Sequence, residues 1–151
     1  MPQSHARIVL HITFSTKGRV PYLQDPKVRK ELYQYIAGTL NKIGCTAIEI
    51  NGVADHVHVL CNLSRTVAVA KLLETIKASS SAWVKKQGAE YETFSWQGGY
   101  GAFSVSPSKV AEARRYVQNQ EAHHRRMTFQ EEFRMICERH SIQIDERYVW
   151  D

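Results

Sequence analysis

The chain has 151 residues, of which 43% are hydrophobic and 23% charged, and its formal net charge is +5. This balance predicts one globular domain over residues 1–151 and excludes a disordered chain. No apolar run approaches the roughly 20 residues of a membrane span, and the N-terminus has no signal-peptide pattern, so we expect a cytoplasmic protein without a membrane partner.

The first half of the chain predicts a strand, a helix and a hairpin. Apolar and polar residues alternate over residues 6–16, which is typical of a strand with one buried face. Asp25 can cap a helix that Gly44 ends. Residues 45–62 then predict a hairpin, because the Asn51-Gly52 pair is the strongest two-residue turn signal in a sequence.

The second half predicts one further strand between helices. Apolar residues recur at helical spacing over residues 67–86, and the turn-rich segment that follows leads into a strand at residues 102–106. A helix that contains Tyr116 begins at Ser106-Pro107, and another is predicted over residues 129–139. The tail carries no element that the pattern defines.

The order of these elements predicts the fold class. Strand, helix, strand, strand, helix, strand, helix and helix match the split βαβ arrangement of ferredoxin-like α+β folds. Such a fold has an antiparallel sheet with helices on one face, which leaves the other face for the active site. We expect His56 and His58 on that open face, because Val57 and Val59 are the better core residues.

Two histidines on one strand suggest a metal site. His56 and His58 are two residues apart, so their side chains project from the same face of a strand, while Val57 points to the other face. Two imidazoles held in this way can bind one metal ion. Two histidines on a solvated strand face would give the same pattern, and the sequence of this strand alone does not separate the two interpretations.

A second pair of residues adds a nucleophile and a third ligand. Tyr116 and Gln120 are four apart, so on one helix they share a face. Two histidines and the Gln120 carbonyl form an uncharged ligand set with open positions, which suits Mg²⁺ or Mn²⁺ rather than structural zinc. Both could also be ordinary helix residues. His123 and His124 offer alternative ligands, or a cationic helix end.

Taken together, these residues resemble the single-tyrosine HUH transposases of bacterial insertion sequences, the IS200-like transposases. The resemblance begins with His56-Val57-His58 followed by Tyr116 and Gln120, in that order and at that separation. It extends over nearly the whole chain through four further stretches, Phe14–Lys17, Lys77–Trp83, Trp96–Tyr100 and Phe103–Val105.

The resemblance implies an enzyme that nicks and rejoins single-stranded DNA at hairpin-bearing element ends through a 5′-phosphotyrosine. It implies that Tyr116 is the nucleophile and that His56, His58 and Gln120 hold the divalent metal. It also implies a homodimer. Members of the family often complete each site with the tyrosine helix of the partner subunit, and the sequence leaves open whether Tyr116 acts within its own chain.

The basic residues around these motifs predict the DNA contacts, since excess positive charge favours phosphate-rich partners. The candidates are Lys77, Ser80, Lys85, Arg114 and Arg115. A solvated charged face is the alternative for the lysines. Two other functions fit the same motifs: a relative that binds DNA hairpins without cutting them, and a phosphodiesterase that uses histidine-bound metal and water.

Overall fold

Four strands form one antiparallel sheet in the computed structural model, which describes residues 2–151. The spatial order is β2-β3-β1-β4, so the first and third strands lie at the centre and both crossovers carry a helix. The strands are β1 (Val9–Ser15), β2 (Ala47–Gly52), β3 (His56–Asn62) and β4 (Gly101–Val105). This is the α+β, split βαβ arrangement that the sequence predicted.

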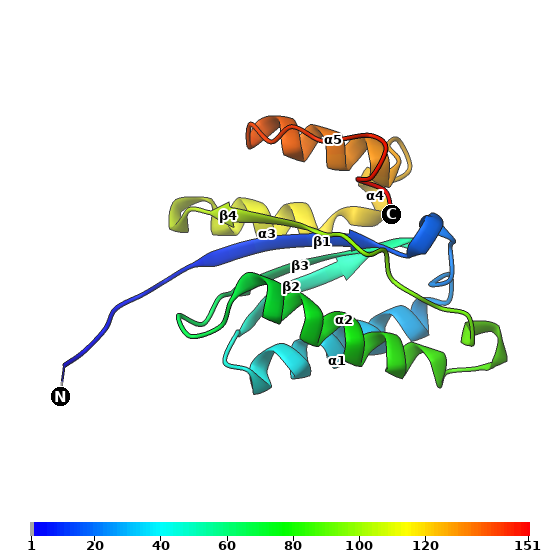
Figure 1. The fold of residues 1–151 in the computed structure, drawn as a ribbon, viewed down its shortest axis with the longest axis horizontal. Coiled ribbons are helices and arrows are strands. Elements are labelled where there is room, and N and C mark those ends of the chain that lie inside the picture. The colour runs from blue at the N-terminus through cyan, green and yellow to red at the C-terminus, as the bar shows by residue number, and fades with distance from the viewer. Residues whose placement is uncertain (1) are drawn as a thin grey trace.

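Two long helices cover one face of the sheet, as Figure 1 shows: α1 (Pro26–Lys42) and α2 (Val69–Lys85). The Asp25 side chain accepts a hydrogen bond from the Lys27 amide and caps α1, as predicted. Ile12 and Phe14 of β1 and Val57 of β3 are fully buried in the main core between sheet and helices. The alternation of apolar and polar residues in the sequence therefore correctly identifies which side chains of β1 face this core.

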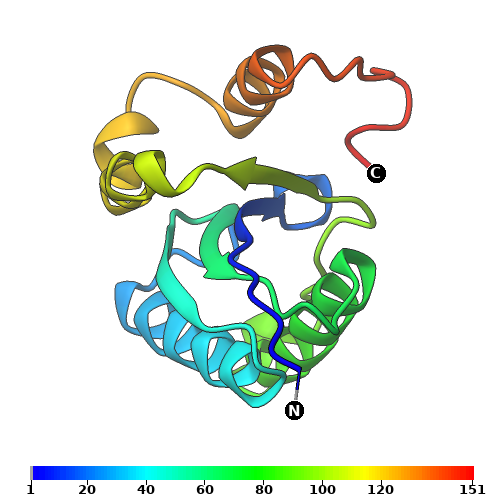
Figure 2. The same cartoon turned by 90° about the vertical axis from the view of Figure 1, so that its left-hand side faces the viewer.

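The opposite face, which we expected to be open, is covered by the rest of the chain. Here lie α3 (Val110–Gln118), α4 (Gln120–His123) and α5 (Phe129–Arg139), as Figures 1 and 2 show. The apolar side of α5 packs with Phe103 of β4, and Val117 of α3 packs on Val9 and Leu60. His56 and His58 are therefore fully buried, and the expectation of an open face is wrong.

The hairpin between β2 and β3 turns later than predicted. Asn51 and Gly52 belong to β2, where Gly52 pairs with Val57, and the chain reverses between Val53 and Asp55. The Val53 amide donates to the carbonyl oxygen of His56 at 3.1 Å. Gly52 is needed for close approach rather than for a turn, because a Cβ there would overlap that carbonyl oxygen and lie 3.0 Å from the Val57 Cα.

We expect Gly52→Ala to lower the free energy of unfolding by about 2–3 kcal/mol, because the colliding atoms are backbone and cannot rotate away. Gly38→Ala is the matched control. Gly38 lies inside α1 with no atom within 4 Å of the added Cβ, so alanine should raise stability by about 0.5–1 kcal/mol. Urea unfolding measures both changes, and equal midpoints for Gly52→Ala and the unchanged protein would contradict the argument.

None of the helices in residues 2–151 has the length and hydropathy needed to cross a membrane.

Candidate active site

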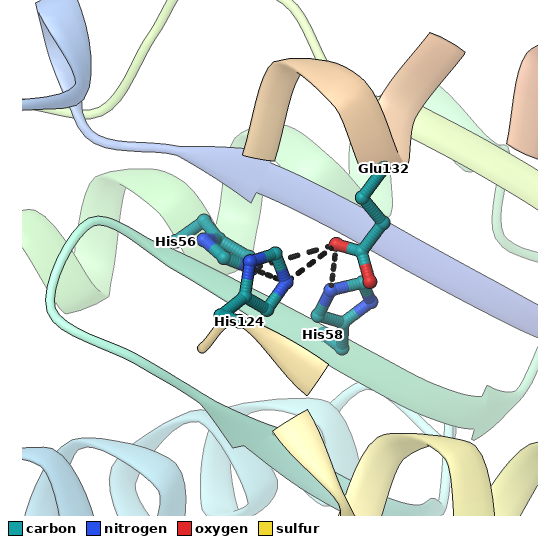
Figure 3. A group of neighbouring side chains, drawn as sticks. All are labelled: His56, His58, His124 and Glu132. Carbon is teal, nitrogen blue, oxygen red and sulfur yellow. Dashed lines mark hydrogen bonds and ion pairs between the residues drawn. The ribbon is translucent and has the colours of Figure 1, made fainter. Parts of the chain in front are cut away.

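Three imidazoles and one carboxylate converge on the face of the sheet that α3, α4 and α5 cover (Figure 3). His56 and His58 come from β3, His124 follows α4, and Glu132 comes from α5. The Oε1 atom of Glu132 lies 2.8 Å from Nε2 of His58, 3.0 Å from Nε2 of His124 and 3.5 Å from Nε2 of His56. One ligand atom from each residue lies within 4.8 Å of all the others, which is the spacing of a metal centre.

The outer nitrogen of each ring is held by a second partner. The contacts are His56 Nδ1 with Asp55 Oδ1 at 2.6 Å, His124 Nδ1 with the Met127 carbonyl oxygen at 2.7 Å, and His58 Nδ1 with His11 Nε2 at 2.7 Å. A partner on Nδ1 fixes the orientation of an imidazole and directs Nε2 toward the centre. Metal-binding histidines usually have such a second contact on the nitrogen that does not bind the metal.

The surroundings favour the protonation states that a metal requires at two of the groups and oppose them at a third. Burial lowers the pKa of His58 to about 4, so its ring is neutral at pH 7. Burial alone would raise the pKa of the Glu132 carboxyl, but hydrogen bonds with His124, His56 and His58 outweigh it and hold that pKa far below its usual range. Burial lowers the pKa of His56, but hydrogen bonds with Asp55 and Glu132 outweigh it and raise that pKa above its usual value. Neutral imidazole and ionised carboxylate are the forms that bind cations.

Tyr116 of α3 reaches the same cluster. Its hydroxyl donates a short hydrogen bond to Oε2 of Glu132 and lies 3.3 Å from Nε2 of His123. The Tyr116 ring centroid is 6.0 Å from that of His58. Burial raises the pKa of Tyr116, and the negative charge of Glu132 raises it further. The structure therefore brings the predicted nucleophile and the predicted metal-binding histidines together within one chain.

Gln120 was predicted to lie on the same helix as Tyr116, but the structure places it on the next helix. Helix α3 ends at Gln118, the backbone departs from helical geometry at Asn119, and Gln120 begins α4. Gln120 is fully buried and its Nε2 donates to the Tyr116 carbonyl oxygen at 3.3 Å. Its Oε1 has no hydrogen-bond partner among the described residues. A buried carbonyl oxygen without a donor is available to a cation.

Asn51, which we predicted as a turn residue, instead anchors the end of α3. Its Nδ2 donates to the carbonyl oxygens of Val117 at 3.1 Å and Gln118 at 3.0 Å. The last carbonyls of a helix lack partners within the helix, so an outside donor stabilises that end. Because Tyr116 directly precedes these residues, Asn51 connects the position of the tyrosine to strand β2.

We expect Asn51→Ala to lower the free energy of unfolding by about 1–2 kcal/mol, because the helix carbonyls lose their donor. It should also speed amide hydrogen exchange at Asn119, whose N–H donates to the Arg115 and Tyr116 carbonyl oxygens at the end of α3. Asn62→Ala is the control, since the side-chain amide of Asn62 donates to the exposed Thr46 hydroxyl and not to a helix end. Unchanged exchange at Asn119 would show that Asn51 does not hold the helix end.

The residues predicted to contact DNA lie apart from one another. Ser80 is fully buried, and its hydroxyl accepts from Nε1 of Trp96 at 2.9 Å, so its side chain presents no atom that could contact DNA, contrary to the prediction. Lys77 donates to loop carbonyls, among them Gly99 at 2.9 Å. Lys77, Ser80 and Lys85 all belong to α2, which lies on the face of the sheet opposite the helix of Tyr116 (Figure 1).

The two predicted arginines share the tyrosine helix. Arg114 is exposed and pairs with Glu49 of β2 at 3.1 Å, and Arg115 is exposed beside it. Two pockets flank the site. One of about 380 Å³ is lined by Tyr116, Lys109 and Arg139, among others. The other, of about 670 Å³, lies beside His124 and its lining includes three arginines, Arg29, Arg125 and Arg126. Each lining also holds carboxylates, Glu112 in the first pocket and Asp55, Glu121 and Glu131 in the second, so the charge at both approaches is mixed.

Sequence reasoning missed Glu132, although the sequence contains a signal for it. Glu132 lies between Phe129 and Ile136 on the buried side of α5, where an apolar residue is expected. A carboxylate at such a position needs a partner, because an unpaired buried charge is strongly unfavourable. The sequence indicates His124 only as an alternative ligand or a helix-end cation, and the structure places it in the cluster.

A sequence profile of the family described as "Transposase IS200 like" matches residues 4–120. The fold is similar to two solved structures. One is a candidate transposase of Deinococcus radiodurans, with a TM-score of 0.61 and 19% identity over 80% of this chain and 98% of that one. The other is a REP-associated tyrosine transposase bound to a REP hairpin, with a TM-score of 0.60 and 11% identity over 82% of this chain and 73% of that one. No curated protein sequence matches the chain.

Proposed function

The chain belongs to the IS200-like transposase family, and on this premise we propose that it nicks and rejoins single-stranded DNA through a covalent bond to Tyr116. One observation carries the proposal. The Tyr116 hydroxyl lies in the same buried cluster as His56 and His58, and each of these residues comes from the same chain.

Tyr116 attacks the phosphorus of a DNA phosphodiester with its phenolic oxygen. A bond forms between that oxygen and phosphorus, and the bond from phosphorus to the 3′ oxygen breaks, which leaves a 5′-phosphotyrosine and a free 3′-hydroxyl. Oε2 of Glu132 accepts the phenolic hydrogen bond and so orients the oxygen for attack, and the proton that the phenol loses balances the proton that the departing 3′ oxygen gains. A 3′-hydroxyl that attacks the phosphotyrosine reverses these steps and rejoins the strand without an external energy source.

We propose that His56, His58 and Gln120 hold a divalent ion, Mg²⁺ or Mn²⁺. The directed Nε2 atoms of the histidines fit such an ion, and so does Oε1 of Gln120, which has no hydrogen-bond partner within residues 2–151. A bound ion would polarise the phosphodiester and stabilise the charge that develops on its oxygens. The chain itself contributes orientation, because Asp55 and His11 fix the two rings, and exclusion of water, because the cluster is buried.

We propose that the DNA partner is single-stranded DNA with hairpins, by analogy with the hairpin that one structural neighbour binds. Arg114 and Arg115 lie on the helix of Tyr116, so we retain them as contacts near the cleaved linkage. Lys77 and Lys85 lie across the sheet and would contact only DNA that extends to that face. We further propose a homodimer, in which each Tyr116 acts with the histidines of its own chain.

The test is a denaturing gel. The protein is incubated with labelled single-stranded DNA from the flanks of its own gene, together with Mg²⁺ or Mn²⁺. We expect a protein–DNA adduct that survives denaturation. Cleaved DNA with no adduct would instead support a phosphodiesterase that uses water. A mobility shift on a native gel with neither product would support a hairpin-binding relative that does not cut.

A further inference from the structure

Two of the four converging groups come from a segment beyond the family match. The match ends at residue 120, whereas His124 and Glu132 follow it. The remaining chain forms α5 and a tail, with Trp150 packed beside Phe133 of α5. Residues after the matched region therefore contribute as many side chains to the cluster as the matched strand does.

The atoms that face the centre of the cluster are ones that can bind a cation. His56 and His124 each use Nδ1 against an oxygen acceptor, Asp55 Oδ1 and the Met127 carbonyl oxygen, so each ring donates from that side. When both rings are neutral, this tautomer presents lone pairs at Nε2, and the two Nε2 atoms lie 3.0 Å apart. Oε1 of Glu132 brings further lone pairs to the same point.

These contacts favour a metal centre over an ordinary buried ion pair. A carboxylate that is needed only to neutralise a charge can be satisfied by one histidine, whereas Oε1 of Glu132 is approached by three Nε2 atoms. Each of the three rings is also fixed from outside, by Asp55, His11 or Met127. Such outer contacts orient metal ligands and raise their basicity.

We infer that His124 and Glu132 are metal ligands in addition to the proposed His56, His58 and Gln120, and that this nitrogen-rich centre selects a first-row transition ion such as Mn²⁺ over Mg²⁺, which narrows the choice of ion proposed above. The inference deepens the proposed function, since it concerns the same site. Imidazole nitrogen suits transition ions, whereas Mg²⁺ prefers oxygen ligands and retains several waters. Three imidazoles with one carboxylate therefore disfavour Mg²⁺.

A structural consequence accompanies this ligand set. His56 and His58 belong to the sheet, while Glu132 belongs to α5, so one ion would join the two layers. Binding to the folded state alone stabilises that state. Mn²⁺ should therefore protect the connection between α4 and α5, residues 124–128, from proteolysis, and this protection should require Glu132.

The test is a titration of the full chain with Mn²⁺ alone, without DNA, followed by calorimetry. We expect Glu132→Gln and His124→Asn each to weaken Mn²⁺ binding by about 10-fold or more, and Mg²⁺ to compete poorly. Glu131→Gln is the matched control. Glu131 is the exposed neighbour whose carboxylate accepts from the Thr128 cap hydroxyl, and glutamine can retain that contact. Circular dichroism confirms that each variant is folded.

Pulsed electron paramagnetic resonance of the unaltered protein with Mn²⁺ provides a second readout that needs no variant. Three coordinated imidazole nitrogens are expected, and two would overturn the role of His124. Binding to Glu132→Gln that equals or exceeds that of the unaltered protein would show that Glu132 competes with the ion rather than binding it, which also overturns the inference. A covalent DNA adduct formed by the unaltered protein would still support the proposed function in either case.

Discussion

Replacing Tyr116 with phenylalanine should abolish the covalent DNA adduct and lower strand cleavage by a factor on the order of 10⁴ or more. The substitution removes the nucleophilic oxygen and retains the ring, which packs 5.9 Å from the His11 ring centroid and 6.0 Å from that of His58. The measurement is a denaturing gel with labelled hairpin DNA and Mn²⁺.

Tyr148→Phe is the matched control for this experiment. Tyr148 is 64% exposed in the C-terminal tail, so losing its hydroxyl should leave the adduct unchanged. Tyr116→Phe also removes the hydrogen bond to Glu132, which costs about 1–2 kcal/mol of stability, and thermal unfolding shows whether the variant is folded at the assay temperature. An adduct that persists at full yield in Tyr116→Phe would exclude this residue as the nucleophile.

Replacing His58 with alanine should remove both Mn²⁺ binding and adduct formation, the latter by a factor on the order of 10³. His58 is fully buried, contacts Glu132 at 2.8 Å and stacks on His11. Alanine therefore deletes a ligand and leaves the Glu132 carboxylate with one fewer partner. His56→Ala should behave similarly, since its Nε2 faces the same point.

A chelator tests whether the unaltered protein needs a metal ion, without changing its sequence or its fold. The unaltered protein treated with EDTA should form no adduct and should recover fully with added Mn²⁺, whereas His58→Ala should not recover. His5→Ala is the control, because His5 is exposed near the N-terminus and lies outside the cluster. Undiminished adduct formation by His58→Ala in the presence of EDTA would mean that no metal takes part in the reaction.

Local patterns in the sequence predicted the fold because local rules determine strands and helix ends. Alternation in β1 identified the buried face that holds Ile12 and Phe14, and Asp25 capped α1 as its side chain allows. The strand period also placed His56 and His58 on one face correctly. The same period could not reveal that α5, about 70 residues later, covers that face.

The remaining features of the site depend on contacts between distant segments. Asn51 and Gly52 have the sequence of a turn, but the Asn51 side chain donates to a carbonyl oxygen at the end of α3. Gly52 is needed because the backbone of β3 approaches it too closely for a Cβ. Glu132 was visible only as a charge on the apolar side of a helix, and its partners were not predictable from spacing. Tyr116 and Gln120 were predicted on one helix, yet a break at Asn119 separates them.

The most direct measurement of the central claim is mass spectrometry of the trapped protein–DNA adduct after proteolysis. The account predicts one modified peptide, with the nucleotide joined through a 5′ phosphate to the Tyr116 oxygen, and a free 3′-hydroxyl on the released strand. A nucleotide joined to any other residue, or cleaved DNA with no modified peptide, would contradict it.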